Sequence, residues 1–297
     1  MLNLDNPSVA LAILPFCSTD SPPVGLAMLS AILRGRGHKV CALDLNLEAR
    51  DAAPPELSYL WSGQQMMELV EPEPFQALLP RAEILVEFCI KRLLETGADV
   101  LGFSLFTTNV RFTAEVVRRM RQRRGAPVVI FGGPSCKVTG EREWAGPGLA
   151  NAWVCGDGED LLPAVLELDD EQAPPGVILG LDTNPAFSVE FGVAADLEAH
   201  PFPDYDDLAP ERYDRRSSRG EPVLPLVSSR GCIMRCAFCN ERSLEKRYRT
   251  RSADHIYAEL AHLHGRYGPV AFRFNDQLLN GNLKVLSALA DRIIEGG

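Results

Sequence analysis

From residue 8 to about residue 166, the chain alternates short apolar runs with longer amphipathic segments, and this rhythm restricts the possible folds. Apolar or β-branched runs predict five strands, at residues 8–14, 39–44, 100–104, 127–131 and 152–155. The segments between them place apolar residues on one helical face, as at residues 25–36 and 111–123. Strands that alternate with helices in this way form parallel sheets covered by crossover helices. The sequence therefore predicts an α/β fold that begins with a doubly wound parallel sheet.

Two segments interrupt this alternation. Residues 52–76 contain four prolines and predict an insertion before a helix at residues 78–95. Residues 200–208 combine prolines with acidic side chains and predict an extended connector. A second β-α-β-α series follows, with strands at residues 223–228 and 270–275 and helices at residues 252–267 and 283–294. We therefore place a first domain at residues 1–197, a linker at 198–222 and a second domain at 223–297.

The two parts of the chain differ in charge. Residues 1–210 contain 15 basic and 30 acidic side chains, whereas residues 211–297 contain 15 and 10. The acidic first part disfavours a nucleic-acid partner there, and the basic second part could attract an anionic cofactor, a carboxylate or a phosphate backbone. A nucleic-acid patch is the least favoured of these, because the second part shows no binding module. No run approaches the roughly 18 to 20 apolar residues of a membrane span, and residues 1–7 lack the features of a signal peptide. We expect a cytoplasmic protein with no membrane partner.

Three of the eight cysteines, Cys232, Cys236 and Cys239, lie in a C-x3-C-x2-C motif directly after a predicted strand. Three thiolates on one loop can converge on a single centre, and in a cubane iron-sulfur cluster they would leave one iron open. Zinc is the competing interpretation, but it would need a fourth ligand from the histidines of the predicted helix at residues 252–267. Cysteines without a metal are the third alternative. The spacing favours the cluster.

Small residues end three successive predicted strands: Gly102 and Ser104, then Gly132 and Gly133, and then residues 156–159, which read Gly-Asp-Gly-Glu. Because the carboxyl ends of parallel strands meet at one edge of a sheet, the backbone there can approach a large flat or elongated ligand closely. Tight turns are the alternative explanation for any single loop. The chain has neither G-x-G-x-x-G after its first strand nor a G-x-x-x-x-G-K-[ST] motif, so it lacks the phosphate-binding loops of dinucleotide and nucleoside triphosphate sites.

The cysteine motif, with Phe238 before its third cysteine, resembles the radical S-adenosylmethionine (SAM) superfamily, whose signature follows the first strand of a partial β/α barrel. The resemblance implies that Cys232, Cys236 and Cys239 hold a [4Fe-4S] cluster whose open iron chelates SAM. Reduction of the cluster would then cleave SAM to a 5′-deoxyadenosyl radical. The resemblance also implies a cellular electron donor such as flavodoxin or ferredoxin.

The same resemblance implies where SAM is bound. Asn275 and Asp276 end a predicted strand where relatives often have Gly-Gly-Glu, whose backbone and acid contact the methionine amino group. Arg249 and Arg251 follow the cluster loop, where an arginine can pair with the methionine carboxylate. Phe238 completes the implied SAM-binding set. A polar strand-to-helix turn and a solvated basic face are the alternatives for these segments.

The strand ends resemble the cobalamin-binding domain that precedes the barrel in one large radical SAM class. Ser104 and the Gly132-Gly133 pair match its Ser-x-Leu and Gly-Gly elements, with Phe106 where leucine is usual. The implied cobalamin contacts are Ser104, Leu105, Thr107, Gly132, Gly133, Gly156, Gly158 and Glu159. The loop at residues 15–25 lacks the histidine of the family's D-x-H-x-x-G motif, so the resemblance implies base-off cobalamin without a histidine ligand, a form that permits methyl transfer.

These features together predict a radical SAM enzyme that uses cobalamin to C-methylate or otherwise transform a small molecule or a peptide. A methylthiotransferase-like or cobalamin-independent radical SAM enzyme is the first alternative, and a non-catalytic zinc or iron-sulfur binding module is the second. A β/α barrel uses roughly 30 residues per unit, so residues 223–297 have room for about two. We therefore expect an incomplete barrel, in an amino-terminal portion of a longer chain or in a chain that pairs with another polypeptide.

Overall fold

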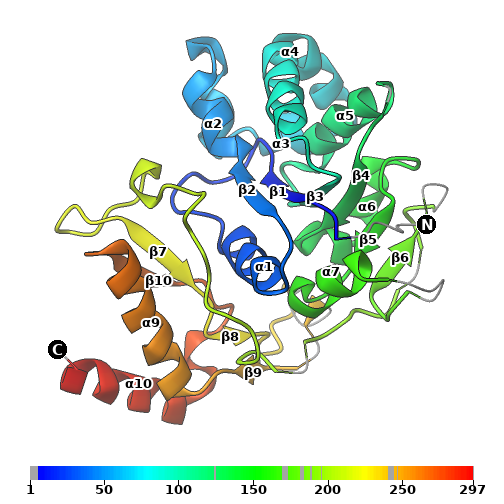
Figure 1. Ribbon diagram of the computed structural model, residues 1–297. Helices are drawn as coiled ribbons and strands as arrows, with labels where there is room; N and C mark the ends of the chain where they lie inside the picture. Colours follow the sequence, from blue (N-terminus) through cyan, green and yellow to red (C-terminus); the bar gives the residue numbers. More distant parts are fainter. Residues whose placement is uncertain are drawn as a thin grey trace.

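The computed structural model describes residues 6–123, 125–168, 173–180, 184–187, 189–194, 196–239, 244–245 and 247–296 (Figure 1). At its centre is a six-stranded sheet in the order β2-β1-β3-β4-β5-β6. The strands are β1 (Val9–Ile13), β2 (Val40–Asp44), β3 (Val100–Ser104), β4 (Val128–Gly132), β5 (Ala152–Val154) and β6 (Val177–Leu179). The first five are parallel, and β6 pairs antiparallel with β5. The predicted α/β fold with a mostly parallel sheet is confirmed; β6 was not predicted.

Alternate residues of each strand enter two apolar clusters, one on each face of the sheet. In β1, Ala10 and Ala12 join the first cluster, whereas Val9, Leu11 and Ile13 join the second. The first cluster packs against α2 (Leu45–Ala52), α4 (Pro72–Glu95), α5 (Val110–Arg121) and α6 (Thr139–Ala145). The second packs against α1 (Val24–Gly35) and α7 (Gly158–Leu166). None of the helices in the described residues has the length and apolarity to cross a membrane.

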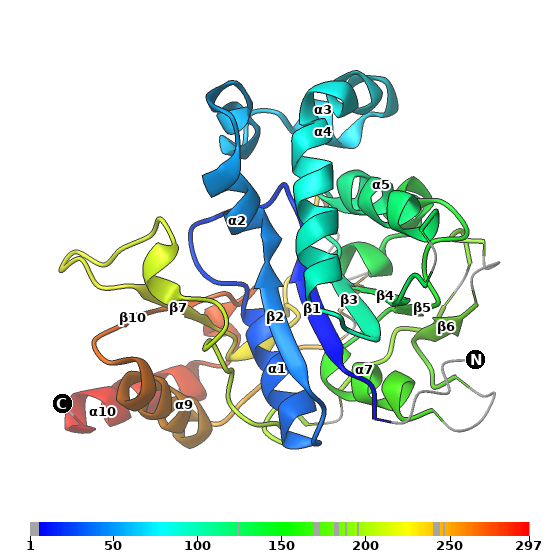
Figure 2. The same cartoon turned by 45° about the horizontal axis from the view of Figure 1, so that its top comes forward.

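The predicted insertion forms two short elements, η1 (Pro55–Trp61) and α3 (Met66–Val70), before α4. Leu57, Leu60 and Leu69 from these elements are buried in the first apolar cluster. Helix α4 begins at Pro72 rather than at the predicted residue 78, because proline lacks only an amide hydrogen that the first turn of a helix does not use. Figure 2 shows the insertion and the upper end of α4 standing above the sheet.

After the sheet, the chain forms a smaller α/β unit. Strands β7 (Val223–Leu226) and β10 (Ala271–Phe274) pair in parallel, flanked by α9 (Ala253–Tyr267) and α10 (Leu283–Gly296). A second, antiparallel pair joins β8 (Ser229–Arg230) to β9 (Arg249–Thr250). Two single turns belong to this part and to the linker before it, η4 (Leu279–Gly281) and η3 (Pro210–Arg212). Another, η2 (Pro134–Lys137), lies in the first part between β4 and α6. The predicted β-α-β-α series is present, whereas the β8–β9 pair was not predicted.

The segment predicted to be an extended connector is packed between the two parts. Tyr205 and Leu208 are buried in the second apolar cluster, together with Leu224 of β7 and Leu263 of α9. The Tyr205 hydroxyl donates a hydrogen bond to the backbone carbonyl oxygen of Pro225 at 2.6 Å. The linker is therefore part of the core, because its aromatic and aliphatic side chains bury the surface that the two parts share.

We expect Tyr205→Ala to lower the free energy of unfolding by about 3–5 kcal/mol, because it removes a fully buried aromatic side chain from this shared core. Tyr205→Phe keeps the ring but leaves the Pro225 carbonyl oxygen unpaired, and should cost about 1–3 kcal/mol. Urea denaturation followed by circular dichroism measures both. A loss below about 1 kcal/mol for the alanine variant would show that the linker does not hold the two parts together.

Candidate functional site

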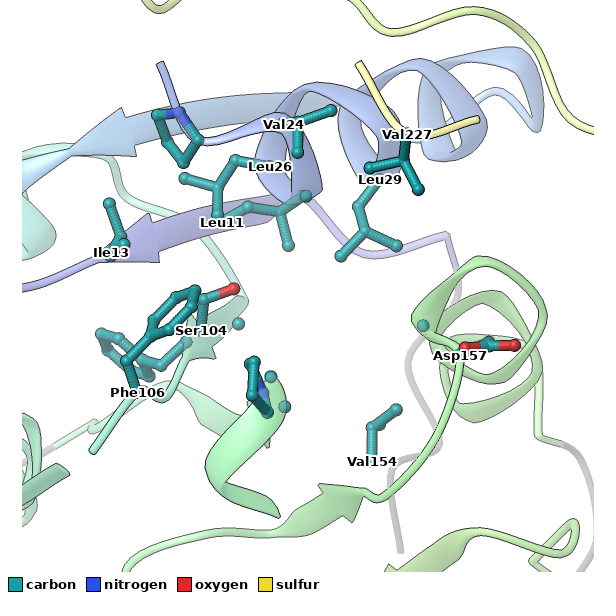
Figure 3. Close-up of a pocket in the computed structure, with 18 of the residues that line it drawn as sticks. Leu11, Ile13, Val24, Leu26, Leu29, Ser104, Phe106, Val154, Asp157 and Val227 are labelled. Atoms are coloured by element: carbon teal, nitrogen blue, oxygen red, sulfur yellow. The ribbon is translucent and has the colours of Figure 1, made fainter. Parts of the chain in front are cut away.

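A cavity of about 730 Å³ lies at the carboxyl edge of the sheet, between α1 and α7 (Figure 3). The strand order reverses direction between β1 and β3, so the helices that follow these strands lie on opposite faces and leave a crevice there. The inner wall of the cavity is apolar and includes Leu11, Ile13, Leu26, Leu29, Ile130 and Val154. Such a crevice is the usual ligand site of open α/β sheets.

Four of the glycines around this cavity fall into two kinds. A Cβ atom at Gly156 would lie 2.1 Å from the carbonyl oxygen of Gly192, and one at Gly133, where φ is +93°, would lie 2.7 Å from the backbone of Leu105. The fold itself needs these two glycines. A Cβ at Gly132 would meet no atom nearer than 3.8 Å, and one at Gly25 would meet none within 4 Å. Their lack of side chains enlarges the cavity without being required by the packing.

Most of the predicted cobalamin contacts line the cavity: Ser104, Gly132, Gly133, Gly156, Gly158 and Glu159. Leu105 and Thr107 are not among the lining residues. Leu105 is buried in the apolar core, and its amide donates to the carbonyl oxygen of Gly132 at 2.8 Å. The Thr107 hydroxyl donates to the Glu141 carboxylate at 3.0 Å. These two residues follow the end of β3, where the chain turns, so a linear motif does not tell which way their side chains point.

Sequence analysis missed one wall of the cavity, the loop between β1 and α1. It contributes residues that share no motif, Cys17, Ser18, Ser21, Pro22 and Pro23. Burial raises the pKa of the Cys17 thiol to about 12, so this cysteine stays protonated. The amide of Cys17 donates to the Asn46 side chain at 2.9 Å, which holds the loop against α2. The prolines that precede α1 predict a rigid loop, but they do not predict that this loop lines a ligand site.

The cysteine motif lies in the segment that joins β8 to β9, here called the cysteine loop, and the β8–β9 pair holds the two ends of this segment together. Cys232 is half-buried, Cys236 and Cys239 are exposed, and none of the three forms a disulfide. Phe238 is 93% exposed. Within the described residues, no three histidine, cysteine or acidic side chains stand close enough together to bind a metal ion. The donor set nevertheless fits a cluster with one open iron, because it offers three free thiols on a single loop.

The flanks of this cysteine loop reach the cavity. Val227, Arg230, Glu245, Asn275 and Gln277 all line it, so the residues that bracket the cysteines share a wall with the strand ends of the first part. Figure 3 shows Val227, Leu29 and Asp157 among the residues that line the cavity. The carboxyl edge of the large sheet and the carboxyl ends of β7 and β10 therefore face one another.

The predicted SAM contacts divide into two groups. Asn275 is exposed and lines the cavity. The Asp276 carboxylate instead accepts hydrogen bonds from the Ser228 amide and the Ser229 hydroxyl, both at 2.8 Å. Arg251 is buried, where it pairs with Glu259 and donates to the Val227 carbonyl oxygen at 2.9 Å.

The guanidinium of Arg249, also a predicted SAM contact, is occupied by protein carboxylates. It lies 2.8 Å from Asp157 and 3.0 Å from Glu245. Burial alone would raise the pKa of the Asp157 carboxyl, but Arg230, the Ala194 amide and Arg249 outweigh burial and hold that pKa below its usual value. Asp157 is therefore a carboxylate at neutral pH, and it links the first part of the chain to the cysteine loop.

The fold and this cavity define an α/β domain with a ligand site at the carboxyl edge of its sheet. In a comparison with known proteins, residues 79–166 match the family model of the B12-binding domain. Over 98% of its length, the chain is 26% identical to "uncharacterized methyltransferase PH0819" of Pyrococcus horikoshii. It spans 56% of the length of that relative.

Two solved structures of the radical SAM methyltransferase TsrM from Kitasatospora setae share the fold at 19% identity, with TM-scores of 0.60 and 0.58. Both alignments cover 97% of this chain, and 50% and 51% of the TsrM chain. One structure contains cobalamin and a [4Fe-4S] cluster, and the other contains tryptophan substrate and a SAM analogue. The likeness extends through the sheet, the linker and the smaller α/β unit.

In the metal-free chain, we expect Cys236 and Cys239 to react with iodoacetamide at least about ten times faster than Cys89 and Cys136. The first two thiols are exposed, whereas burial leaves the other two inaccessible and raises their pKa values, so that little thiolate forms. Mass spectrometry of peptides along a labelling time course measures each site. Equal labelling of all four would show that the cysteine loop is not exposed as described.

Proposed function

We propose that this chain is the cobalamin-binding part and the cluster-binding start of a radical SAM methyltransferase. The observation that carries the proposal is the shared cavity, whose walls come from the glycine-lined strand ends and from the flanks of the cysteine loop. A single crevice can therefore hold a large ligand against both. When bound, cobalamin would supply the methyl group and the cluster would supply the electron that cleaves SAM.

In this proposal, the residues of the chain have separate tasks. Gly25 and Gly132 leave room for the cobalamin ring, and the apolar wall around Leu11 and Leu29 excludes water from it. The thiols of Cys232, Cys236 and Cys239 bind the cluster. Asn275, with Gln277 beside it, is the candidate contact for SAM, because among the residues predicted for that role it faces the cavity.

The relatives support the same proposal. The B12-binding match lies over the part of the chain that forms β3, β4 and β5, whose ends line the cavity. PH0819 is named a methyltransferase, and TsrM is a radical SAM methyltransferase that binds cobalamin and a [4Fe-4S] cluster. We extend these activities to this chain, with a small molecule or a peptide as the substrate and a cellular reductant as the electron donor.

The alternatives differ in what the cavity and the loop bind. A methylthiotransferase-like or cobalamin-independent radical SAM enzyme would load the cluster and leave the cavity without cobalamin. A zinc-binding module would hold a single metal and no sulfide. Gly132 favours cobalamin. The fold has space for a side chain at this position, so packing does not require the glycine, whereas a side chain there would reduce the volume of the cavity.

Anaerobic reconstitution with iron and sulfide tests the cluster. We expect about four irons and four sulfides per chain, and Cys236→Ala should abolish this loading. Cys41→Ala is the matched control, since Cys41 lies on β2 outside the loop and its loss should leave loading unchanged. Iron, sulfide and zinc analyses measure the outcome. One tightly held zinc per chain and no iron would exclude a radical SAM enzyme.

Hydroxocobalamin binding tests the cavity. We expect the wild-type chain to retain hydroxocobalamin through gel filtration and Gly132→Val to bind it at least about ten times more weakly, because the valine side chain occupies the cavity. The β-branched side chain suits a strand end, so folding should be preserved. Gly140→Val, at an open position of α6, is the control. Loss of hydroxocobalamin from the wild-type chain would overturn the methyl-transfer proposal.

A further inference from the structure

Six charged side chains form a continuous series of ion pairs between the first part of the protein and the cysteine loop. In order they are Lys137, Glu245, Arg249, Asp157, Arg230 and Glu159, so the charges alternate and cancel. Lys137 ends η2, which follows β4, and Asp157 and Glu159 lie at the start of α7, which follows β5. The other three flank the cysteines. Their side chains are only 4–17% exposed, so water screens these pairs weakly.

The β8–β9 pair, which we call the neck of the cysteine loop, explains why these ion pairs are needed. In the β8–β9 pair, Arg230 stands directly opposite Arg249. Like charges at opposed positions of an antiparallel pair repel one another, and partial burial strengthens the repulsion. Gly231, where φ is +77° and a Cβ would lie 2.6 Å from the carbonyl oxygen of Arg247, makes the approach of the two segments closer still. An anion between the two guanidinium groups offsets this repulsion.

Asp157 is that anion. One of its carboxylate oxygens lies 2.6 Å from Arg230, and the other lies 2.8 Å from Arg249. The second oxygen also accepts a hydrogen bond from the Ala194 amide at 2.8 Å, which helps to hold the carboxylate in place. Asp157 itself follows β5, directly before the first turn of α7, and lines the cavity. Its position is set by the large sheet.

We propose that Asp157 is a positioning residue that closes the neck of the cysteine loop and fixes where its three thiols stand relative to the cavity. The proposal rests on the proposed function only in that the thiols then carry a cluster. In this way, the Asp157 carboxylate of the first part would fix the position of a cluster that the cysteines of the second part bind. The arrangement also couples the two sites, because a shift of the loop after β5 moves a cavity wall and the loop neck together.

The test uses Asp157→Asn, which keeps the shape but removes the charge. The control is Asp160→Asn in the first turn of α7, since Asp160 is 46% exposed and pairs with His200 outside the cavity. Hydrogen-deuterium exchange of the metal-free chain should speed up on the order of tenfold or more at β8 and β9, with β1 and β3 unchanged. In the reconstituted chain, Asp157→Asn should still load iron but should shift the electron paramagnetic resonance signal of the reduced cluster.

The double variant Asp157→Asn/Arg249→Gln separates positioning from general stability. Removing one of the two opposed cations relieves the repulsion, so protection at β8 and β9 should return towards the wild-type level. If Asp157→Asn unfolds, the double variant still decides, because recovery supports the inference and continued unfolding overturns it. Exchange and resonance signals equal to those of Asp160→Asn also overturn it. If the wild-type chain takes up no iron, the proposed cluster is refuted. The exchange measurements then test the positioning role of Asp157 independently of the cluster.

Discussion

The order of the strands places α1 on one face of the central sheet and α5 on the other, so that a crevice opens at the carboxyl edge, where residues at the starts of α1 and α7 line it. The cavity lies in that crevice, and the short loops after β3, β4 and β5 form its rim. The smaller α/β unit packs beside the same face, through Leu224 and Leu263. This packing brings its cysteine loop to the open side of the crevice. The site therefore depends on the reversal of strand order in the large sheet.

Much of this could be predicted from the sequence, because strands with both faces buried have a strong apolar signal. Strand β3 has the predicted bounds. The other four predicted strands of the sheet differ from their predicted bounds by one residue, at both ends for β1 and β4 and at one end for β2 and β5. The helices α1, α5, α9 and α10 follow equally clear amphipathic patterns. The three-residue strand β6 carries too few residues for such a signal, and the two-residue strands β8 and β9 depend on contacts between distant segments.

The details of the site were less predictable, for physical reasons. Ion pairs such as that between Arg230 and Glu159 join residues 71 positions apart, and a single sequence gives no signal that two such distant residues are in contact. Arg249 and Arg251 fit a carboxylate-binding role by type, yet protein carboxylates occupy both. The glycines pose the same difficulty, since Gly132 and Gly156 look alike in the sequence and only the surrounding atoms show which of them the backbone requires.

The burial of the linker has a consequence for how such a protein can evolve. Tyr205 and Leu208 complete an apolar cluster that takes side chains from the large sheet, from α1 and from α9. A recombination event that joined the first part to an unrelated second part would leave this cluster half covered, and the exposed surface would favour aggregation. The two parts are therefore constrained to be inherited as a unit, and substitutions on one side of the cluster should be followed by compensating changes on the other.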